Sequence, residues 1–218
     1  MLKRNIIMFF CYMILLGNGL FAAHPLTTDD VGIVDIGKYE LEVGYDNVKE
    51  EDILRNHSCG VSFKHGITDK MDVGISLPYQ IKPKLTEPLG TTTLGLKFLL
   101  IKDIFAFSIN NELGSKEYFL NGIISKNIKP FDLHLNFGYE ASGDEYIEGE
   151  MVYSAAVEYP LEKIDFVGEI VGRENEFENW LVGIRYKLGE ITAVNFAYGN
   201  KDFSKNNEKI AFGFHTEF

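Results

Sequence analysis

The residues from 209 to 218 alternate between two kinds of side chain, and this alternation constrains the fold more than any other feature of the chain. One parity is apolar or aromatic apart from a single threonine: Ile210, Phe212, Phe214, Thr216 and Phe218. The other parity is small, polar or charged: Lys209, Ala211, Gly213, His215 and Glu217. Because successive side chains of a strand point to opposite faces of a sheet, the pattern predicts a β-strand with one apolar face that ends at Phe218.

The same period of two recurs throughout the chain after residue 38, and no helical stripe is sustained there. Alternating runs bounded by turn formers predict half-buried strands. We expect about twelve of them, centred on residues 39–45, 59–63, 71–77, 92–98, 105–109, 118–124, 133–139, 151–159, 166–170, 180–188, 192–198 and 210–218. The sequence therefore predicts an all-β protein.

The polar parity of these strands contains ionisable residues of both signs. The candidates are Glu40, Glu42, Lys64, Asp72, Lys97, His134, Glu158, Glu169, Arg185 and Lys187. In a soluble β-sandwich such residues would face water, whereas in a membrane barrel they would face the lumen and the apolar residues would face lipid. In the barrel they would either line an open polar pore or pair across a narrow lumen and seal it, and alternation alone leaves both possibilities open.

Three further features favour a transmembrane antiparallel up-and-down barrel over the soluble alternative. Aromatic residues gather at strand ends, as an interfacial girdle requires: Tyr39, Tyr45, Tyr139, Tyr159, Trp180, Tyr198 and Phe218. Tight connections at residues 102–103, 160–163 and 188–190 alternate with long acidic ones at 47–57, 78–91, 141–150, 173–179 and 199–208. The third feature is a secretory signal combined with a terminal phenylalanine.

The signal reading rests on the order of zones at the N-terminus. Lys3 and Arg4 precede the apolar run 6–16, and small residues follow at Ala22 and Ala23. The apolar run is too short to span a bilayer, so it is typical of a cleaved signal peptide for Sec export. We therefore expect a signal peptide at 1–23, a plug-like N-terminal segment at 24–37 and an outer-membrane barrel at 38–218.

Removal of the signal leaves a strongly acidic chain with a single cysteine. Loss of the two basic residues would move the formal net charge from -11 to -13. Such a charge excludes nucleic acid as a partner, because nucleic acids are bound through Lys and Arg. Cys59 would be the one cysteine left, so no intrachain disulfide is possible.

The N-terminal segment carries a motif that resembles a known family. Its residues are His24, Pro25, Thr28, Asp29, Asp30, Gly32 and Gly37. Together with the following Lys-Tyr-x-x-Glu pattern, this opening resembles that of the outer-membrane barrels labelled "MetA-pathway of phenol degradation". The resemblance implies a bacterial outer-membrane protein that passes small solutes, aromatic or hydrophobic ones included. The terminal strand also resembles the closing strand of such barrels, in which Phe214 and Phe218 would form the signal read by the barrel-assembly machinery.

Two interpretations of the N-terminal segment remain. Thr and Asp side chains commonly bond nearby backbone amides, so the segment could be an ordered turn that leads into the first strand. Alternatively it folds into the barrel mouth, with Asp29 and Asp30 meeting Arg185, Lys187 or Lys64.

The favoured function is a channel for a small-molecule solute, with outer-membrane lipid and lipopolysaccharide as surroundings. The alternative is a barrel that does not transport and instead stabilises the envelope or displays its loops. No enzyme, cofactor or metal site is predicted, because the histidines are scattered and no catalytic motif is present. His134 with Ser154 is the one pair that could carry hydrolysis. Gly168 and Gly172 are candidate weak points for lateral exit of a hydrophobic solute.

Overall fold

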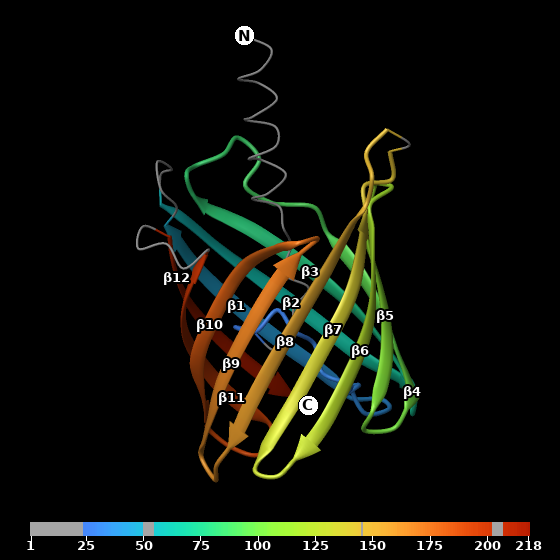
Figure 1. Cartoon of the computed structure of the whole chain (residues 1–218), viewed down its shortest axis with the longest axis vertical. Helices are drawn as coiled ribbons and strands as arrows, with labels where there is room; N and C mark the ends of the chain where they lie inside the picture. The colour runs from blue at the N-terminus through green and yellow to red at the C-terminus, as the bar shows by residue number, and fades with distance from the viewer. Residues whose placement is uncertain (1–23, 50–54, 145, 202–206) are drawn as a thin grey trace.

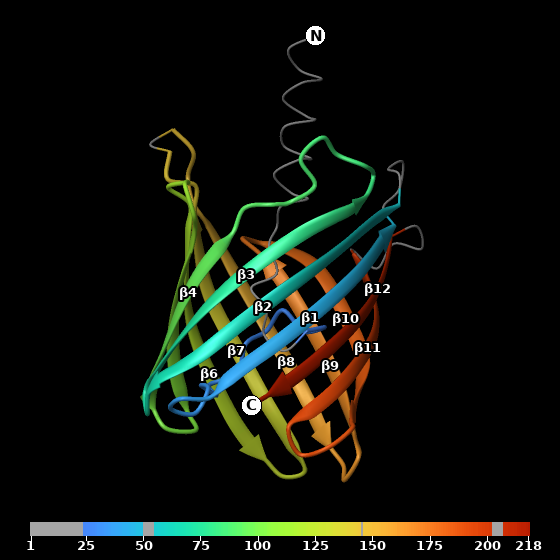
Figure 2. The same cartoon turned by 180° about the vertical axis from the view of Figure 1, so that it is seen from behind.

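The structure is a computed structural model that describes residues 24–49, 55–144, 146–201 and 207–218. Its strands form one closed antiparallel barrel, which confirms the predicted fold (Figures 1 and 2). The strands are β1 (Tyr39–Lys49), β2 (Asn56–Thr68), β3 (Met71–Lys82), β4 (Thr93–Ile101), β5 (Phe105–Glu112), β6 (Tyr118–Ile128), β7 (Phe131–Ala141), β8 (Glu150–Pro160), β9 (Ile164–Arg173), β10 (Glu176–Lys187), β11 (Thr192–Lys201) and β12 (Glu208–Glu217). Among the described residues, no helix is long and apolar enough to cross a membrane.

The barrel closes where the two ends of the chain meet. Each strand pairs with its neighbours in sequence, and β1 pairs with β12 with Val43 opposite Phe214. The amides of Tyr39 and Phe218 donate to each other's carbonyl oxygens at 2.8 and 2.9 Å. Closure leaves no unpaired sheet edge, which is the condition for a β-structure to span lipid.

Alternation separates an apolar outer face from a polar inner face. Large apolar side chains such as Phe137, Phe166 and Ile170 are about half exposed, on the outside of the barrel. On the opposite parity Ala197 and Ala211 are fully buried, next to charged and amide side chains. A single sheet closed on itself excludes the two packed sheets of the soluble sandwich alternative.

Aromatic rings cluster at the end of the barrel where the chain terminates. Tyr39 stacks on Phe63 and on Phe218, with ring centroids 5.3 and 5.8 Å apart. Phe63 also lies 6.4 Å from Phe218. These rings join β1, β2 and the C-terminus on the outer face, where an interfacial girdle is expected.

The connections differ in length at the two ends, with one departure from expectation. Short turns join the strands at residues 69–70, 102–104, 129–130, 161–163 and 188–191, and longer loops at 83–92 and 142–149 lie at the upper end in Figure 1. The expected long loop at 173–179 is wrong: β9 and β10 are joined by a tight turn at residues 174–175, with Glu174 at a φ of 52°.

Arg173 explains why that acidic run can form a hairpin. Its guanidinium lies 2.7 Å from a carboxylate oxygen of Glu140 and 2.8 Å from one of Glu150. Glu178, at 3.9 Å, lies in the same group. One cation therefore relieves repulsion among carboxylates of β7, β8 and β10.

Candidate functional site

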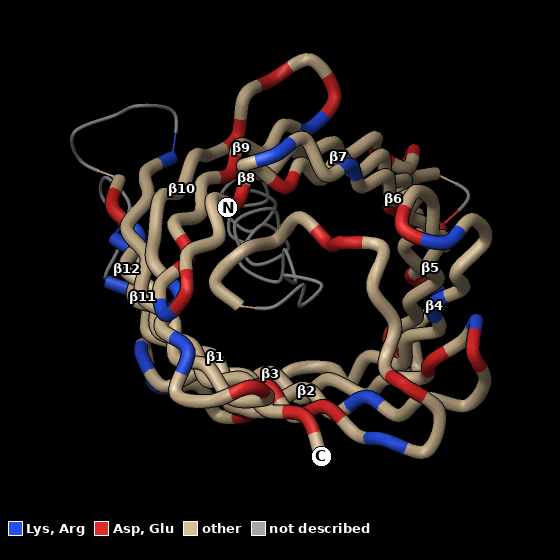
Figure 3. Tube along the Cα trace, turned by 90° about the horizontal axis from the view of Figure 1, so that it is seen from below, with Lys and Arg blue, Asp and Glu red and all other residues tan. Residues whose placement is uncertain are grey.

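The N-terminal segment (residues 24–37) lies inside the barrel rather than beside it. Figure 3, viewed along the barrel, shows it crossing the lumen between the walls. Asn195 on β11 donates to the carbonyl oxygen of His24 at 2.6 Å. At the other end of the segment, the amide of Gly37 donates to the carbonyl oxygen of Gly66 on β2 at 2.9 Å. The segment thus runs along the inner wall from β11 to the base of β2.

Polar side chains of the wall hold the middle of the segment through its backbone. Glu169 on β9 accepts from the amides of Thr27 and Thr28, at 2.5 and 3.1 Å to Oε2. Asn136 on β7 exchanges two hydrogen bonds of 2.8 Å with the amide and carbonyl of Asp29. Backbone amides and carbonyls that are removed from water must form hydrogen bonds. Side chains of the barrel wall form these bonds here, in place of the backbone groups of a neighbouring strand.

Further along, Ser125 and Asp72 repeat this arrangement. The amide of Val31 donates to Ser125 Oγ and that of Val34 donates to Asp72 Oδ2, both at 3.1 Å. A carboxylate of Asp30 accepts from the amide of Gly32 at 2.5 Å, which is the local turn contact expected of an aspartate. The segment therefore combines one local turn with many contacts to the wall.

Two apolar anchors complement the polar contacts. Leu26 is 5% exposed and packs in a cluster with five small or aliphatic wall residues: Ala156, Val167, Leu181, Ala197 and Ala211. Val31 packs against Ala106 and Ile123. Alanines on the inner wall leave the volume that these side chains fill. Burying such a side chain contributes about 1.5–3 kcal/mol.

Lys97 is the cation that meets the aspartates of the segment. Its Nζ lies 2.8 Å from Asp29 Oδ1 and 3.9 Å from Asp30 Oδ1, and Lys97 is only 8% exposed. Among the described residues, Asp29 and Asp30 do not form the expected direct ion pairs with Arg185, Lys187 or Lys64. The register brings each of those cations to a wall carboxylate instead.

Those ion pairs of the wall are short. Lys64 Nζ lies 2.6 Å from Glu40, Arg185 lies 2.9 Å from Glu158, and Lys187 lies 2.7 Å from Asp165.

A further ion pair lies at the base of the segment, outside the strands, where Lys38 lies 2.8 Å from Asp35. The hydrogen bond and the charge of Lys38 lower the pKa of the Asp35 carboxyl.

The pair that could have carried hydrolysis is not formed. His134 Nδ1 lies 2.7 Å from Ser125 Oγ on the neighbouring β6, and Ser154 lies opposite Asn136 in the register of β7 and β8. Ser125 also accepts from the amide of Val31. His134 therefore supports the N-terminal segment through Ser125, and the suggested His134 and Ser154 pair is wrong.

Two cavities border the segment. The larger, of about 290 Å³, lies beside the turn between β10 and β11. Eight carboxylate residues line it, namely Asp29, Asp30, Glu40, Glu42, Asp72, Asp165, Glu190 and Glu217, against four permanent cations, namely Lys64, Lys97, Arg185 and Lys187. A smaller cavity of about 60 Å³ lies toward β3, β4 and β5. Four charged residues line both cavities: Asp29, Lys64, Asp72 and Lys97.

The structure thus places all ten polar-parity candidates on the inner face. Seven line the larger cavity, and Glu158, Glu169 and His134 bind Arg185, the N-terminal segment and Ser125 respectively. The sequence analysis missed the amide and hydroxyl residues that hold the segment, Asn136, Ser125 and Asn195, although each has the inward parity. It also missed the proximity of His215 to Glu40 and Glu42, which depends on the pairing of the first and last strands.

The predicted weak point on β9 is covered on the outer face. A side chain added at Gly172 would meet the ring of Tyr153 at 2.2 Å, so that ring covers the glycine. The pairing of β9 with β10 shifts register between Phe177 and Asn179, next to Gly172. Gly168 has ordinary contact distances.

Comparison with known proteins gives matches in structure alone. No family model matches the chain, and no curated protein matches its sequence. The KdgM porin, solved in complex with disordered oligogalacturonate, is similar over 82% of this chain and 99% of its own, with a TM-score of 0.61 and 10% identity. The NanC porin is similar over 81% and 98%, with a TM-score of 0.59 and 10% identity.

A transporter has a similar fold as well. The toluene transporter TbuX of Ralstonia pickettii is similar over 90% of this chain and 92% of its own, with a TM-score of 0.52 and 10% identity. The chain therefore has the fold of outer-membrane porins and transporters. The resemblance to the "MetA-pathway of phenol degradation" family stays a prediction.

Proposed function

We propose that this protein is an outer-membrane channel for small solutes whose lumen is narrowed by the N-terminal segment. The observation that carries the proposal is that two cavities border the segment inside the barrel and share the charged residues Asp29, Lys64, Asp72 and Lys97. A solute that moves between these cavities would pass the residues that they share, next to the segment. A barrel of about twelve strands is intermediate between filled barrels of eight strands and open porins of sixteen.

The location and assembly follow from the same proposal. Residues 1–23, which lie outside the described residues, would direct Sec export and be removed. The exposed apolar outer face would then contact outer-membrane lipid and lipopolysaccharide. Phe214 and Phe218, on the closing strand, would be read by the barrel-assembly machinery.

The charge of the larger cavity supports a preference for cationic or neutral solutes. Carboxylates outnumber lysine and arginine there by eight to four. Clefts lined by one sign of charge concentrate ions of the opposite sign, and acidic rings favour cations. The oligogalacturonate of the KdgM complex is a polyanion, so this cavity suits a different solute. Neutral aromatic compounds, which the family resemblance implies, remain compatible with the charge.

A second candidate, a barrel that does not transport, is favoured by one observation. The segment is tied to β2, β3, β6, β7, β9 and β11 by hydrogen bonds and buries Leu26. A segment held so widely could seal the lumen permanently. The two functions differ in whether the folded barrel conducts ions.

Ion selectivity in a planar bilayer tests the proposal. With the protein inserted from detergent and a gradient of KCl across the bilayer, the reversal potential should have the sign for preferential K⁺ passage. Addition of a polyanionic oligosaccharide should leave the current unchanged. An anion-selective pore would contradict the solute preference, and a folded barrel without conductance would favour the second candidate.

A further inference from the structure

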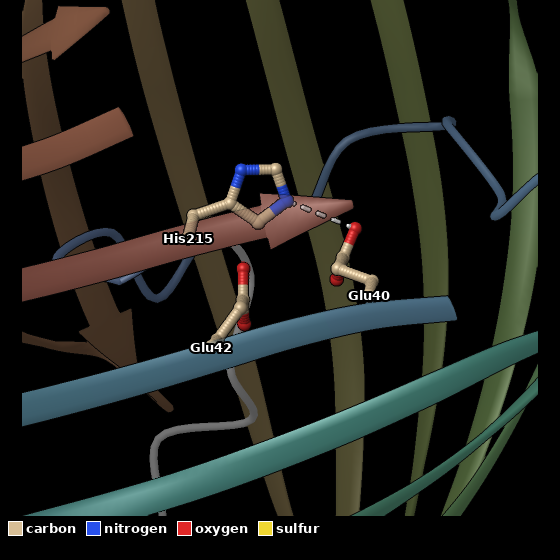
Figure 4. Close-up of side chains that lie close together, drawn as sticks. All are labelled: Glu40, Glu42 and His215. Atoms are coloured by element: carbon tan, nitrogen blue, oxygen red, sulfur yellow. Dashed lines mark ion pairs between the residues drawn. The ribbon is translucent and has the colours of Figure 1, made fainter. Parts of the chain in front are cut away.

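We propose that the lumen holds a binding site for a divalent first-row transition metal ion, formed by Glu40, Glu42 and His215 where the barrel closes. Figure 4 shows the two carboxylates on β1 and the imidazole on β12 pointing toward one another. One candidate ligand atom from each residue lies within 4.8 Å of the others. The proposal goes beyond the channel function and does not depend on it.

Register explains why these three residues meet. Glu42 lies directly opposite His215 in the pairing of β1 with β12, and Glu40 lies opposite Glu217. Glu40 and Glu42 are two residues apart, so they share the inner face of β1. The closing seam therefore brings one imidazole against two carboxylates, from segments at opposite ends of the sequence.

Glu42 supplies an independent observation that points to a ligand. It is 2% exposed, and no hydrogen-bond donor among the described residues reaches either of its carboxylate oxygens. Its nearest cation is Lys64 Nζ at 4.0 Å, too far for a hydrogen bond. A buried carboxylate without such partners is costly, and coordination of a metal ion is one of the ways in which proteins compensate it.

The geometry is close to that of a coordination shell. His215 Nε2 lies 3.3 Å from Glu40 Oε2. Two ligand atoms at about 2.0–2.2 Å from a tetrahedral zinc ion are about 3.4 Å apart, so this pair already has a suitable separation. The remaining separations are at most 4.8 Å, so binding of an ion would require side-chain rotations that shorten them. Glu217, with Oε1 4.0 Å from His215 Nε2, is near enough to join, or water can take the fourth position.

The donor set selects the class of metal. Imidazole suits Zn²⁺, Cu²⁺, Ni²⁺ and Fe²⁺, whereas Ca²⁺ and Mg²⁺ prefer shells made of oxygen alone. All three residues line the larger cavity, so an ion can reach them from water. The proposed site therefore borders the larger cavity, carries negative charge and contains one nitrogen ligand.

Lys64 is the competitor of the metal. Its ammonium lies 2.6 Å from Glu40 and would have to move away when a dication binds. Replacing it with methionine removes this competition while keeping an unbranched side chain. Lys64→Met should therefore bind metal more tightly than the wild-type protein, a result that a merely structural lysine would not give.

The test is zinc binding to the detergent-folded barrel, measured by isothermal titration with ZnCl₂ and by native mass spectrometry. We expect one ion per barrel. His215→Gln and the isosteric Glu42→Gln should each weaken binding at least about 100-fold, because loss of an outer-shell partner alone costs about 10–100-fold. Lys64→Met should strengthen it, and zinc should raise the unfolding temperature of the wild-type barrel by joining β1 to β12.

The matched control is His134→Gln, since His134 is also on the inner face but lies against Ser125. It should bind zinc as the wild type does. Heat-modifiable migration on a gel shows that each variant is folded. Absence of a one-to-one complex in the folded wild type would overturn the proposal, as would binding that persists in both His215→Gln and Glu42→Gln. These measurements need no conducting pore, so they fail independently of the channel function.

Discussion

At the scale of single residues, Lys97 is the wall cation that pairs with the N-terminal segment. Its ammonium is the cation paired with Asp29 and lies near Asp30, and it lines both cavities. Breaking a buried ion pair by removing one partner costs about 3–5 kcal/mol, because the other charge is left uncompensated. Loss of Lys97 should therefore loosen the N-terminal segment rather than merely delete a contact.

We predict that Lys97→Met increases single-channel conductance and cation selectivity, since Asp29 and Asp30 would move toward water and add negative charge to the pore. Current recordings and reversal potentials in bilayers measure both effects. Lys187→Met is the matched control, because Lys187 pairs with Asp165 on the wall and not with the segment. Equal conductance in the two variants would show that the Lys97 pair does not restrain the pore.

The sequence predicts which face of the barrel a side chain occupies, but it does not predict which residue that side chain contacts. The inward parity of Lys97, Glu169 and His134 could be read from alternation, because a strand's period is independent of its neighbours. The residues that these three side chains contact could not be predicted in this way. Asp29 meets Lys97 rather than Arg185, and His134 meets Ser125 rather than Ser154, because partners depend on strand register and on the path of the segment across the lumen.

At the scale of elements, the N-terminal segment behaves as an inner lining fastened to the wall at its base. The segment contacts β2 at Gly66, whose carbonyl oxygen accepts from the amide of Gly37. A Cβ added at Gly66 would lie 2.1 Å from the carbonyl oxygen of Asp35 and 2.3 Å from that of Val34. Those are backbone atoms, which cannot move aside as a flexible side chain can. Glycine is therefore required for the segment to approach β2.

We predict that Gly66→Ala displaces the base of the segment and makes it accessible to protease, while the barrel itself stays folded. Limited proteolysis followed by mass spectrometry detects cleavage within residues 24–37. Gly122→Ala is the control, because the nearest atom to an added Cβ there is 3.7 Å away, an ordinary contact. Protection of the segment in Gly66→Ala equal to that of the wild type would refute this role of Gly66.

The strands themselves could be predicted well, and the acidic hairpin could not. All twelve expected strands are present because each alternating run suits one apolar outer face and one polar inner face. The run from Arg173 to Asn179 was expected to be a loop because of its carboxylates. It continues the β9–β10 ladder because Arg173 compensates Glu140, Glu150 and Glu178, and those contacts cross four strands.

At the scale of the whole molecule, the protein is a closed barrel whose polar interior holds its own N-terminal segment. The outer face is apolar and exposed, and the inner face carries paired charges around two small cavities. Pairs such as Lys64 with Glu40 and Arg185 with Glu158 neutralise the wall locally. Conductance should therefore be limited by the segment and not by the wall.

The most direct test compares the wild-type protein with a variant lacking residues 24–36, by single-channel recording in planar bilayers. Both proteins should show the heat-modifiable gel migration of a folded barrel, because every strand is retained. The account predicts a small or intermittent conductance for the wild type and a larger, steady one for the deletion variant. Unchanged conductance after the deletion would contradict the central claim that this segment narrows the pore.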